Sequence, residues 1–108
     1  MSFPPRTMIY VDYDNTLVLN EDSEGRVYRN EPLVKKLLEQ QHCGIVIWST
    51  RGTEDMRALI SKHFPELFPI ATAIIQKPMI AIDDSPSHLL PDFRIKTPQQ
   101  FLEMQKIP

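Results

Sequence analysis

The hydrophobic positions of this chain fall into short apolar runs separated by amphipathic or polar stretches. Residues 8–11, 45–48, 70–75 and 79–82 are apolar runs of strand length. β-Branched and aromatic side chains are frequent in them, which is typical of buried β-strands. The pattern therefore predicts four short strands that lie within a sheet.

Between and after these runs, apolar side chains recur at helical spacing. The first helix is predicted to begin at Asn30, a capping residue, and to end at Gly44 in a left-handed cap. The second spans residues 54–63 with Thr53 as its cap, and the last begins at Thr97. Strands that alternate with amphipathic helices predict an α/β fold of three layers around a mainly parallel sheet.

One further element interrupts this alternation. Two β-prone stretches surround a polar, Gly-containing turn, and they predict a β-hairpin over residues 17–29. It would project as a flap from the end of the first strand. Residues 1–6 are expected to form a loose arm that is stiffened by two prolines.

Composition and charge limit the class of protein. A length of 108 residues predicts a single domain over residues 1–108. The net charge of −2 gives no clear nucleic-acid footprint. A single cysteine, Cys43, excludes an internal disulfide. No signal peptide or membrane span is evident, so the expected location is cytoplasmic.

Carboxylate and hydroxyl side chains follow three of the predicted strands, and a lysine precedes the last of these strands. In a parallel sheet these strand ends meet at one edge, where ligands bind. Four carboxylates and a single lysine at that edge would repel one another without a cation, and oxygen ligands select a hard ion such as Mg²⁺. Taken alone, the first two aspartates are equally explained as turn-forming residues. The converging side chains are Asp12, Asp14, Ser49, Thr50, Lys77, Asp83 and Asp84.

These residues resemble the motifs of the haloacid dehalogenase (HAD) superfamily of phosphohydrolases. The run from Asp12 to Thr16 is similar to its Asp-x-Asp-x-Thr motif, and 45–49 to its second motif, an apolar strand that ends in Ser or Thr. Lys77 resembles the third-motif lysine, and 80–84 the acidic fourth motif. The resemblance implies a HAD-like Rossmannoid fold of the small type that has no cap domain.

The resemblance also implies an activity, that of a Mg²⁺-dependent phosphomonoester hydrolase. Asp12 would be the nucleophile that forms an aspartyl-phosphate, and Asp14 the general acid and base. Lys77 and Ser49 would hold the phosphoryl oxygens, with Thr50 as the alternative hydroxyl and Arg51 as a further contact. The metal ligands would be Asp12, Asp14, Asp83 and Asp84.

Two departures from the family pattern leave other functions open. Asn15 stands where the family usually has glycine, and Lys77 precedes Asp83 by only six positions. A non-catalytic phosphate- or metal-binding module of the same fold is therefore one alternative, and a receiver-like phospho-acceptor is another. Without a cap domain the site would be open. It would admit a phosphorylated small molecule or macromolecule, or be closed by a second copy or a partner.

Overall fold

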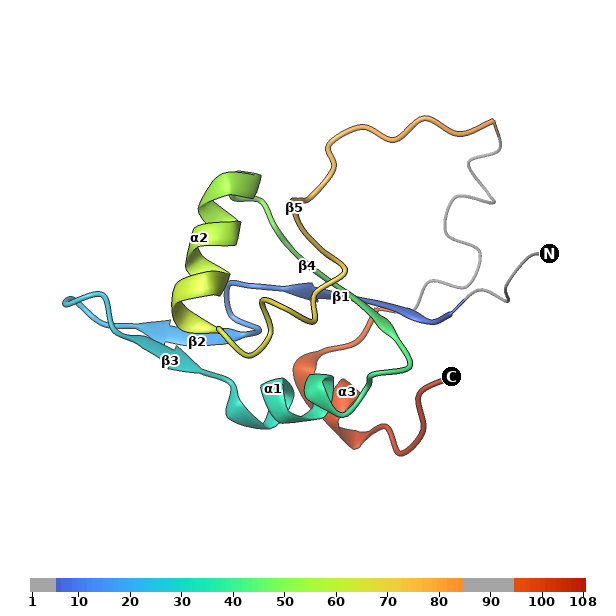
Figure 1. The fold of residues 1–108 in the computed structure, drawn as a ribbon, viewed down its shortest axis with the longest axis horizontal. Coiled ribbons are helices and arrows are strands. Elements are labelled where there is room, and N and C mark those ends of the chain that lie inside the picture. Colours follow the sequence, from blue (N-terminus) through green and yellow to red (C-terminus); the bar gives the residue numbers. More distant parts are fainter. Residues whose placement is uncertain (1–5, 85–94) are drawn as a thin grey trace.

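Three strands form a parallel sheet in the computed structural model, which describes residues 6–84 and 95–108 (Figure 1). The strands are β1 (Met8–Asp12), β4 (Gly44–Ser49) and β5 (Ala73–Gln76), and they lie in the order β1-β4-β5. This arrangement confirms the predicted α/β class with a parallel sheet. It also confirms that Asp12 and Ser49 end neighbouring strands on the same edge of the sheet.

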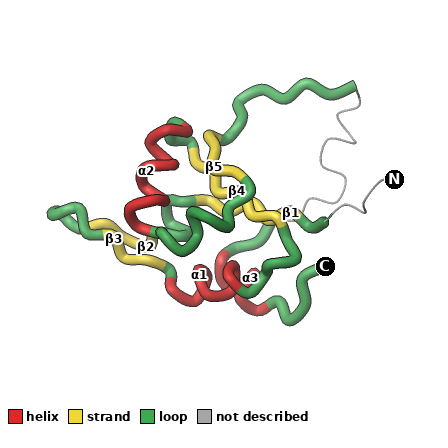
Figure 2. The backbone as a smooth tube through the Cα atoms, in the orientation of Figure 1, coloured by secondary structure: helices red, strands yellow, loops and turns green. Residues whose placement is uncertain are grey.

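Helices connect and follow these strands (Figure 2). α1 spans Glu31–Leu38, α2 spans Thr53–His63 and α3 spans Pro98–Glu103. The predicted starts of the first and last helices are confirmed by their caps. The side chain of Asn30 accepts a hydrogen bond from the backbone of α1, and Thr97 forms a capping box with Gln100.

Two predicted helix boundaries are wrong. Gly44 does not cap α1, which ends at Leu38; it opens β4 instead, where a Cβ atom would lie 2.3 Å from the sulfur of Met8. Thr53 is the first residue of α2, not its cap. Its hydroxyl accepts a hydrogen bond from the backbone N–H of Gln76 and so links α2 to the end of β5.

The predicted hairpin over residues 17–29 is present as the antiparallel pair β2 (Val18–Glu21) and β3 (Val27–Arg29). It extends away from the sheet (Figure 1). Gly25, with φ of 82°, provides the left-handed residue that its turn requires. The hairpin therefore stands beside the end of β1, as the sequence predicts.

The core lies on one face of the sheet. Alternate residues of the strands, such as Val11 and Ile47, pack in one buried cluster with side chains from α1 and α2. On the other face Met8, Tyr10 and Ile75 are exposed. Over the described ranges the sheet and helices thus share a single core on one side, and the predicted third layer is not seen there. No helix in these ranges is both long and apolar enough to cross a membrane.

The largest difference from the predicted fold follows β5. The run Met79–Ile82 is not a strand: it is exposed and leads away from the sheet (Figure 1). Only Lys77 and Pro78 separate it from β5. A further parallel strand needs a crossover of about a dozen residues, so this link is too short. The two-residue link after β5 is the physical reason why the run 79–82 does not form a further parallel strand.

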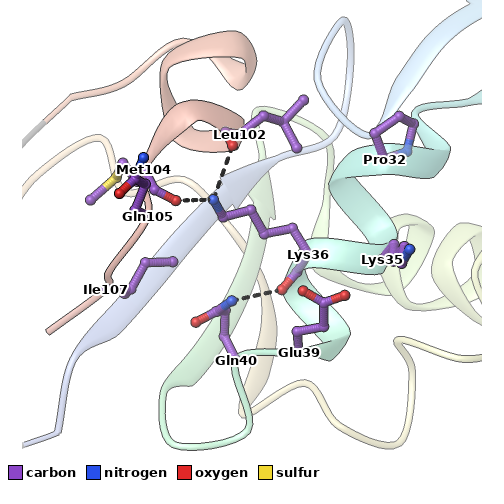
Figure 3. A pocket seen from close by; sticks show the side chains of 9 residues that line it. All are labelled: Pro32, Lys35, Lys36, Glu39, Gln40, Leu102, Met104, Gln105 and Ile107. Atoms are coloured by element: carbon purple, nitrogen blue, oxygen red, sulfur yellow. Dashed lines mark hydrogen bonds between the residues drawn. The ribbon is translucent and has the colours of Figure 1, made fainter.

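A lysine joins α1 to the C-terminal segment. The ammonium group of Lys36 donates hydrogen bonds to the backbone carbonyls of Leu102 and Met104, and it lies 5.4 Å from the ring centre of Phe101 (Figure 3). A cation at the end of α3 satisfies carbonyl groups that the helix leaves unpaired. The cavity beside it, of about 370 Å³, also contacts Gln40 and Ile107. This contact attaches the chain's last helix to the core.

Candidate functional site

The site is built around Asp12, the last residue of β1. Its carboxylate lies 3.2 Å from the ammonium nitrogen of Lys77, which directly follows β5. The backbone N–H of Lys77 also donates to the carbonyl of Ser49, which fixes the start of the lysine side chain at the edge of the sheet. The structure therefore brings together Asp12 and Lys77, two residues that the sequence placed at this edge.

Asp14 lies in the loop that follows β1, and Arg51 holds it. The Nε and Nη2 atoms of Arg51 donate to the two carboxylate oxygens of Asp14, each at 3.1 Å. The side-chain hydrogen bond and charge of Asp14 raise the pKa of Arg51 above its usual value. A paired, two-pronged contact of this kind fixes the orientation of both groups. The sequence suggested Arg51 as a phosphate contact but did not reveal this partner.

The loop that carries Asp14 is tightly constrained. Asn15 has a φ of 62°, the left-handed conformation that asparagine tolerates better than most residues. The carbonyl of Tyr13 accepts hydrogen bonds from the backbones of Thr16 and Val18. Tyr13 itself is buried against the ring of Phe64, and burial is the main factor that raises the pKa of its hydroxyl. The absence of glycine at position 15 thus does not prevent the sharp turn.

The two hydroxyl residues after β4 differ in access. Ser49 is only 2% exposed, and its oxygen accepts a hydrogen bond from the backbone N–H of Arg51. Thr50 is exposed. The hydroxyl of Ser49 therefore helps to position the loop that carries Arg51. It is buried and does not face solvent.

Asp83 and Asp84 are not brought to this edge. Both are exposed, and they belong to the segment after β5 that leads away from the sheet (Figure 1). Within residues 6–84 and 95–108, no three His, Cys, Asp or Glu side chains lie close enough to hold a metal ion together. The described site contains two carboxylates, Asp12 and Asp14, and two cations, Lys77 and Arg51. The predicted loop over residues 85–88 lies outside the described residues.

An aromatic pair lies beside the site on the open face of the sheet. The rings of Tyr10 and Trp48 meet edge to face with centres 4.7 Å apart, and the ammonium of Lys77 lies 5.8 Å from the ring centre of Trp48. Trp48 belongs to the run 45–48 that the sequence predicts as a buried strand, but its side chain is only partly buried. Trp48 directly precedes Ser49, the first polar residue at the end of β4. This position in the sequence is the signal that could have placed Trp48 near the site.

Comparison with known proteins supports the fold alone. No protein-family model matches the chain, and no curated protein matches it. The chain is similar to a target protein from Vibrio cholerae that is known from a crystal structure, with a TM-score of 0.54 and 20% sequence identity. The similarity covers 91% of this chain and 89% of that one. At this identity the likeness shows a shared α/β fold and does not extend to activity.

Proposed function

We propose that this protein is a phosphomonoester hydrolase of the HAD type that acts through an aspartyl-phosphate. One observation carries the proposal: the carboxylate of Asp12 at the ligand-binding edge of a parallel sheet, 3.2 Å from the ammonium of Lys77 and two residues before a second carboxylate. A carboxylate beside a fixed cation suits nucleophilic attack on a phosphoryl group, because the cation offsets the charge on the phosphoryl oxygens.

The residues divide the reaction between them. An oxygen of Asp12 forms a bond to phosphorus while the bond from phosphorus to the alcohol oxygen breaks, and Asp14 supplies the proton that the leaving oxygen takes. Asp14 then removes a proton from the water that hydrolyses the aspartyl-phosphate. Lys77 holds the transferred group. Arg51 binds phosphate as well as carboxylate, so an entering phosphoryl group competes for it and frees Asp14 for proton transfer.

Asp12 and Asp14 fit a magnesium ion of the usual kind in enzymes. Mg²⁺ is commonly bound by one or two carboxylates together with water and substrate phosphate. The carboxylate of Asp12 and the backbone carbonyl of Asp14 would supply protein ligands, which leaves the carboxylate of Asp14 for proton transfer. The bound ion would neutralise the developing charge on the phosphoryl group. Asp83 and Asp84 are proposed as further ligands. Seven extended residues span about 23 Å at most, whereas β5 and β1 are two strand spacings, or about 10 Å, apart. Their segment is therefore long enough to cross the edge.

A non-catalytic phosphate-binding module of the same fold is the second candidate. The observation that favours it is the charge balance of the site, in which Lys77 faces Asp12 and Arg51 faces Asp14. In such a module an anion would bind by displacing a carboxylate from Lys77 or Arg51. It would lack turnover if Asp14 stays with Arg51 when the ligand binds.

The test compares the wild type with Asp12→Asn. We expect the wild type to release phosphate from p-nitrophenyl phosphate in the presence of Mg²⁺, and EDTA to abolish this release. Asp12→Asn should lower kcat by about a thousandfold or more, since it removes the nucleophile. The matched control is Asp55→Asn, a change at an exposed carboxylate of α2, which should leave turnover unaltered.

Other outcomes separate the alternatives. Equal turnover by wild type and Asp12→Asn excludes Asp12 as the nucleophile. Binding of inorganic phosphate without turnover favours the non-catalytic module. A stable phosphoryl group on Asp12 after treatment with acetyl phosphate favours a receiver-like acceptor. Fluoroberyllate with Mg²⁺ should raise the Tm of the wild type and not that of Asp12→Asn, a measurement that does not depend on turnover.

A further inference from the structure

A small groove opens directly beside Asp14, between its loop and the strand β2. Its volume is about 160 Å³, below the range of about 300–1,000 Å³ that is usual for larger ligands. Asp14, the proposed general acid, is one of the residues that line it. The lining residues are Asp14, Asn15, Val18, Leu19, Asn20 and Glu21.

The groove is a fixed part of the fold. An isolated backbone bridge joins Asp14 to Val18. At the other end of the hairpin's base, the side chain of Asn30 donates to the carbonyl of Thr16 and its backbone N–H donates to Leu17. The hairpin is thus attached at several points to the loop that carries Asp14. A group bound in the groove would therefore be held in a defined position relative to that carboxylate.

A β-bulge shapes the wall of the groove. Val18 pairs with Arg29 and Asn20 pairs with Tyr28, so Leu19 is the additional residue between two paired positions. Bulges of this kind redirect a side chain and are frequent beside active sites. The exposed side chain of Leu19 consequently lines the groove and offers an apolar contact among polar neighbours.

The charges around the groove have one sign. The charged side chains that line it are Asp14 and Glu21, both acidic, and the remaining polar ones are the amides of Asn15 and Asn20. Arg51 contacts Asp14 and does not line the groove. Asp14 foremost, and Glu21 among the weaker causes, hold the pKa of Arg51 above its usual value, so Glu21 lies near enough to influence charges at the site. Because Arg51 offsets the charge of Asp14, repulsion of a further negative charge in the groove comes mainly from Glu21.

We propose that this groove binds the leaving alcohol of the substrate and that Glu21 selects against alcohols that carry a negative charge. The inference rests on the proposed function, because it uses Asp14 as the donor of the leaving group's proton. The substrate class is then the phosphate esters of small polyols or amino alcohols. Carbon atoms contact Leu19, and hydroxyl or amine groups pair with Asn20 and Glu21.

The test uses two esters that differ at one carbon. Glycerol 3-phosphate and 3-phosphoglycerate share a three-carbon chain, a phosphate and the central hydroxyl, but one ends in CH₂OH and the other in a carboxylate. We expect the wild type to prefer glycerol 3-phosphate in kcat/KM. Glu21→Gln should raise kcat/KM for 3-phosphoglycerate about fivefold, the size expected for one like charge at close range in water, with little change for glycerol 3-phosphate.

The control is Glu24→Gln, the same change in the turn of the same hairpin, where the side chain is exposed and does not line the groove. It should leave the ratio between the two esters unchanged. High salt should reduce the effect of Glu21→Gln, because screening weakens charge repulsion. Calorimetry with Asp12→Asn, alone and combined with Glu21→Gln, measures binding of both esters without turnover.

Each outcome decides a separate question. If both esters are hydrolysed and the ratio of their kcat/KM values is the same in Glu21→Gln and wild type, the role of the groove is overturned. The phosphatase proposal then still stands. No turnover of either ester or of p-nitrophenyl phosphate, together with a Glu21-dependent binding preference, overturns the phosphatase proposal and supports the groove as a binding site. Neither turnover nor any binding preference overturns both.

Discussion

At the level of single residues, the site is a set of two balanced ion pairs. Lys77 lies 3.2 Å from Asp12, and Arg51 lies 3.1 Å from Asp14. Neither cation is buried deeply enough to be unavailable to a ligand, since all four side chains are partly exposed. Under the proposed function, a phosphoryl group that enters this site would replace carboxylate as the partner of at least one cation. Its arrival would therefore also free a carboxylate for proton transfer or metal binding.

Asp84 is proposed as a further Mg²⁺ ligand at this site. A carboxylate that phosphate frees from its cation would be available to bind the same ion. If Asp84 supplies a third carboxylate, Asp84→Asn should raise the Mg²⁺ concentration for half-maximal turnover about tenfold, the lower end of the loss seen when a supporting group at a metal site is changed. The maximal kcat should change less. Phosphate release across a Mg²⁺ titration measures both quantities.

The same titration with Asp55→Asn is the control for a general loss of charge, because Asp55 lies at the start of α2. A Mg²⁺ requirement identical in Asp84→Asn and wild type would contradict the role of Asp84 and leave Asp12 and Asp14 as the ligands.

The residues of the site were partly predictable. The apolar run that ends in Asp12 correctly placed this carboxylate at the same sheet edge as Lys77, because parallel strands end at one edge. The pairing of Arg51 with Asp14 was not predictable, since it depends on the direction that the loop after Ser49 takes. That direction is set by the hydrogen bond from Arg51 N–H to the buried Ser49 hydroxyl, which sequence spacing does not encode.

At the level of elements, one arginine connects the hairpin to two helices. Arg29 of β3 donates from both terminal nitrogens to the carboxylate of Glu66, each at 2.9 Å, and also to the carbonyl of His63 at the end of α2. Its guanidinium lies 4.9 Å from the ring centre of Phe64, and a further bond reaches Glu31 of α1. The orientation of the flap therefore depends on this contact.

Acid should weaken this contact. The hydrogen bonds from Arg29 hold the pKa of Glu66 below its usual value of 4.5. The unfolded chain therefore binds a proton more readily than the folded one, and stability rises with pH in this window. The contribution should be complete above about pH 4.5 and be lost as pH falls further through the lowered pKa. Urea unfolding between pH 3 and pH 6 would show a smaller acid-dependent loss in Glu66→Gln than in wild type.

Glu24→Gln provides the comparison, because Glu24 is an exposed glutamate of the hairpin turn that takes no part in the Arg29–Glu66 contact. It should retain the acid dependence of the wild type. If Glu66→Gln and wild type lose stability in parallel below pH 4.5, the contact contributes nothing measurable.

At the level of the whole molecule, the α/β class with a parallel sheet was predictable and the extent of the sheet was not. The spacing of apolar runs and capping residues predicted β1, β4 and the start of α1, but not its end at Leu38. It also predicted a strand at 79–82, because that run has the composition of one. Local composition does not report whether the chain can reach a sheet edge. With only Lys77 and Pro78 after β5, it cannot cross back to run parallel, and an antiparallel return would carry Asp83 away from Asp12.

This difference is measurable as stability. Ile80 and Ile82 are 84% and 96% exposed, whereas Ile74 in β5 is 5% exposed. Ile80→Ser should therefore change the free energy of unfolding by less than about 0.5 kcal/mol, as exposed positions do. Ile74→Ser, the same change in the core, should cost about 3 kcal/mol or more. Urea unfolding monitored by the fluorescence of Trp48 compares the two variants. A loss in Ile80→Ser close to that in Ile74→Ser would mean that the run packs as a strand after all. Asp84 would then sit at a fixed place in the sheet and would not depend on the reach of an extended segment.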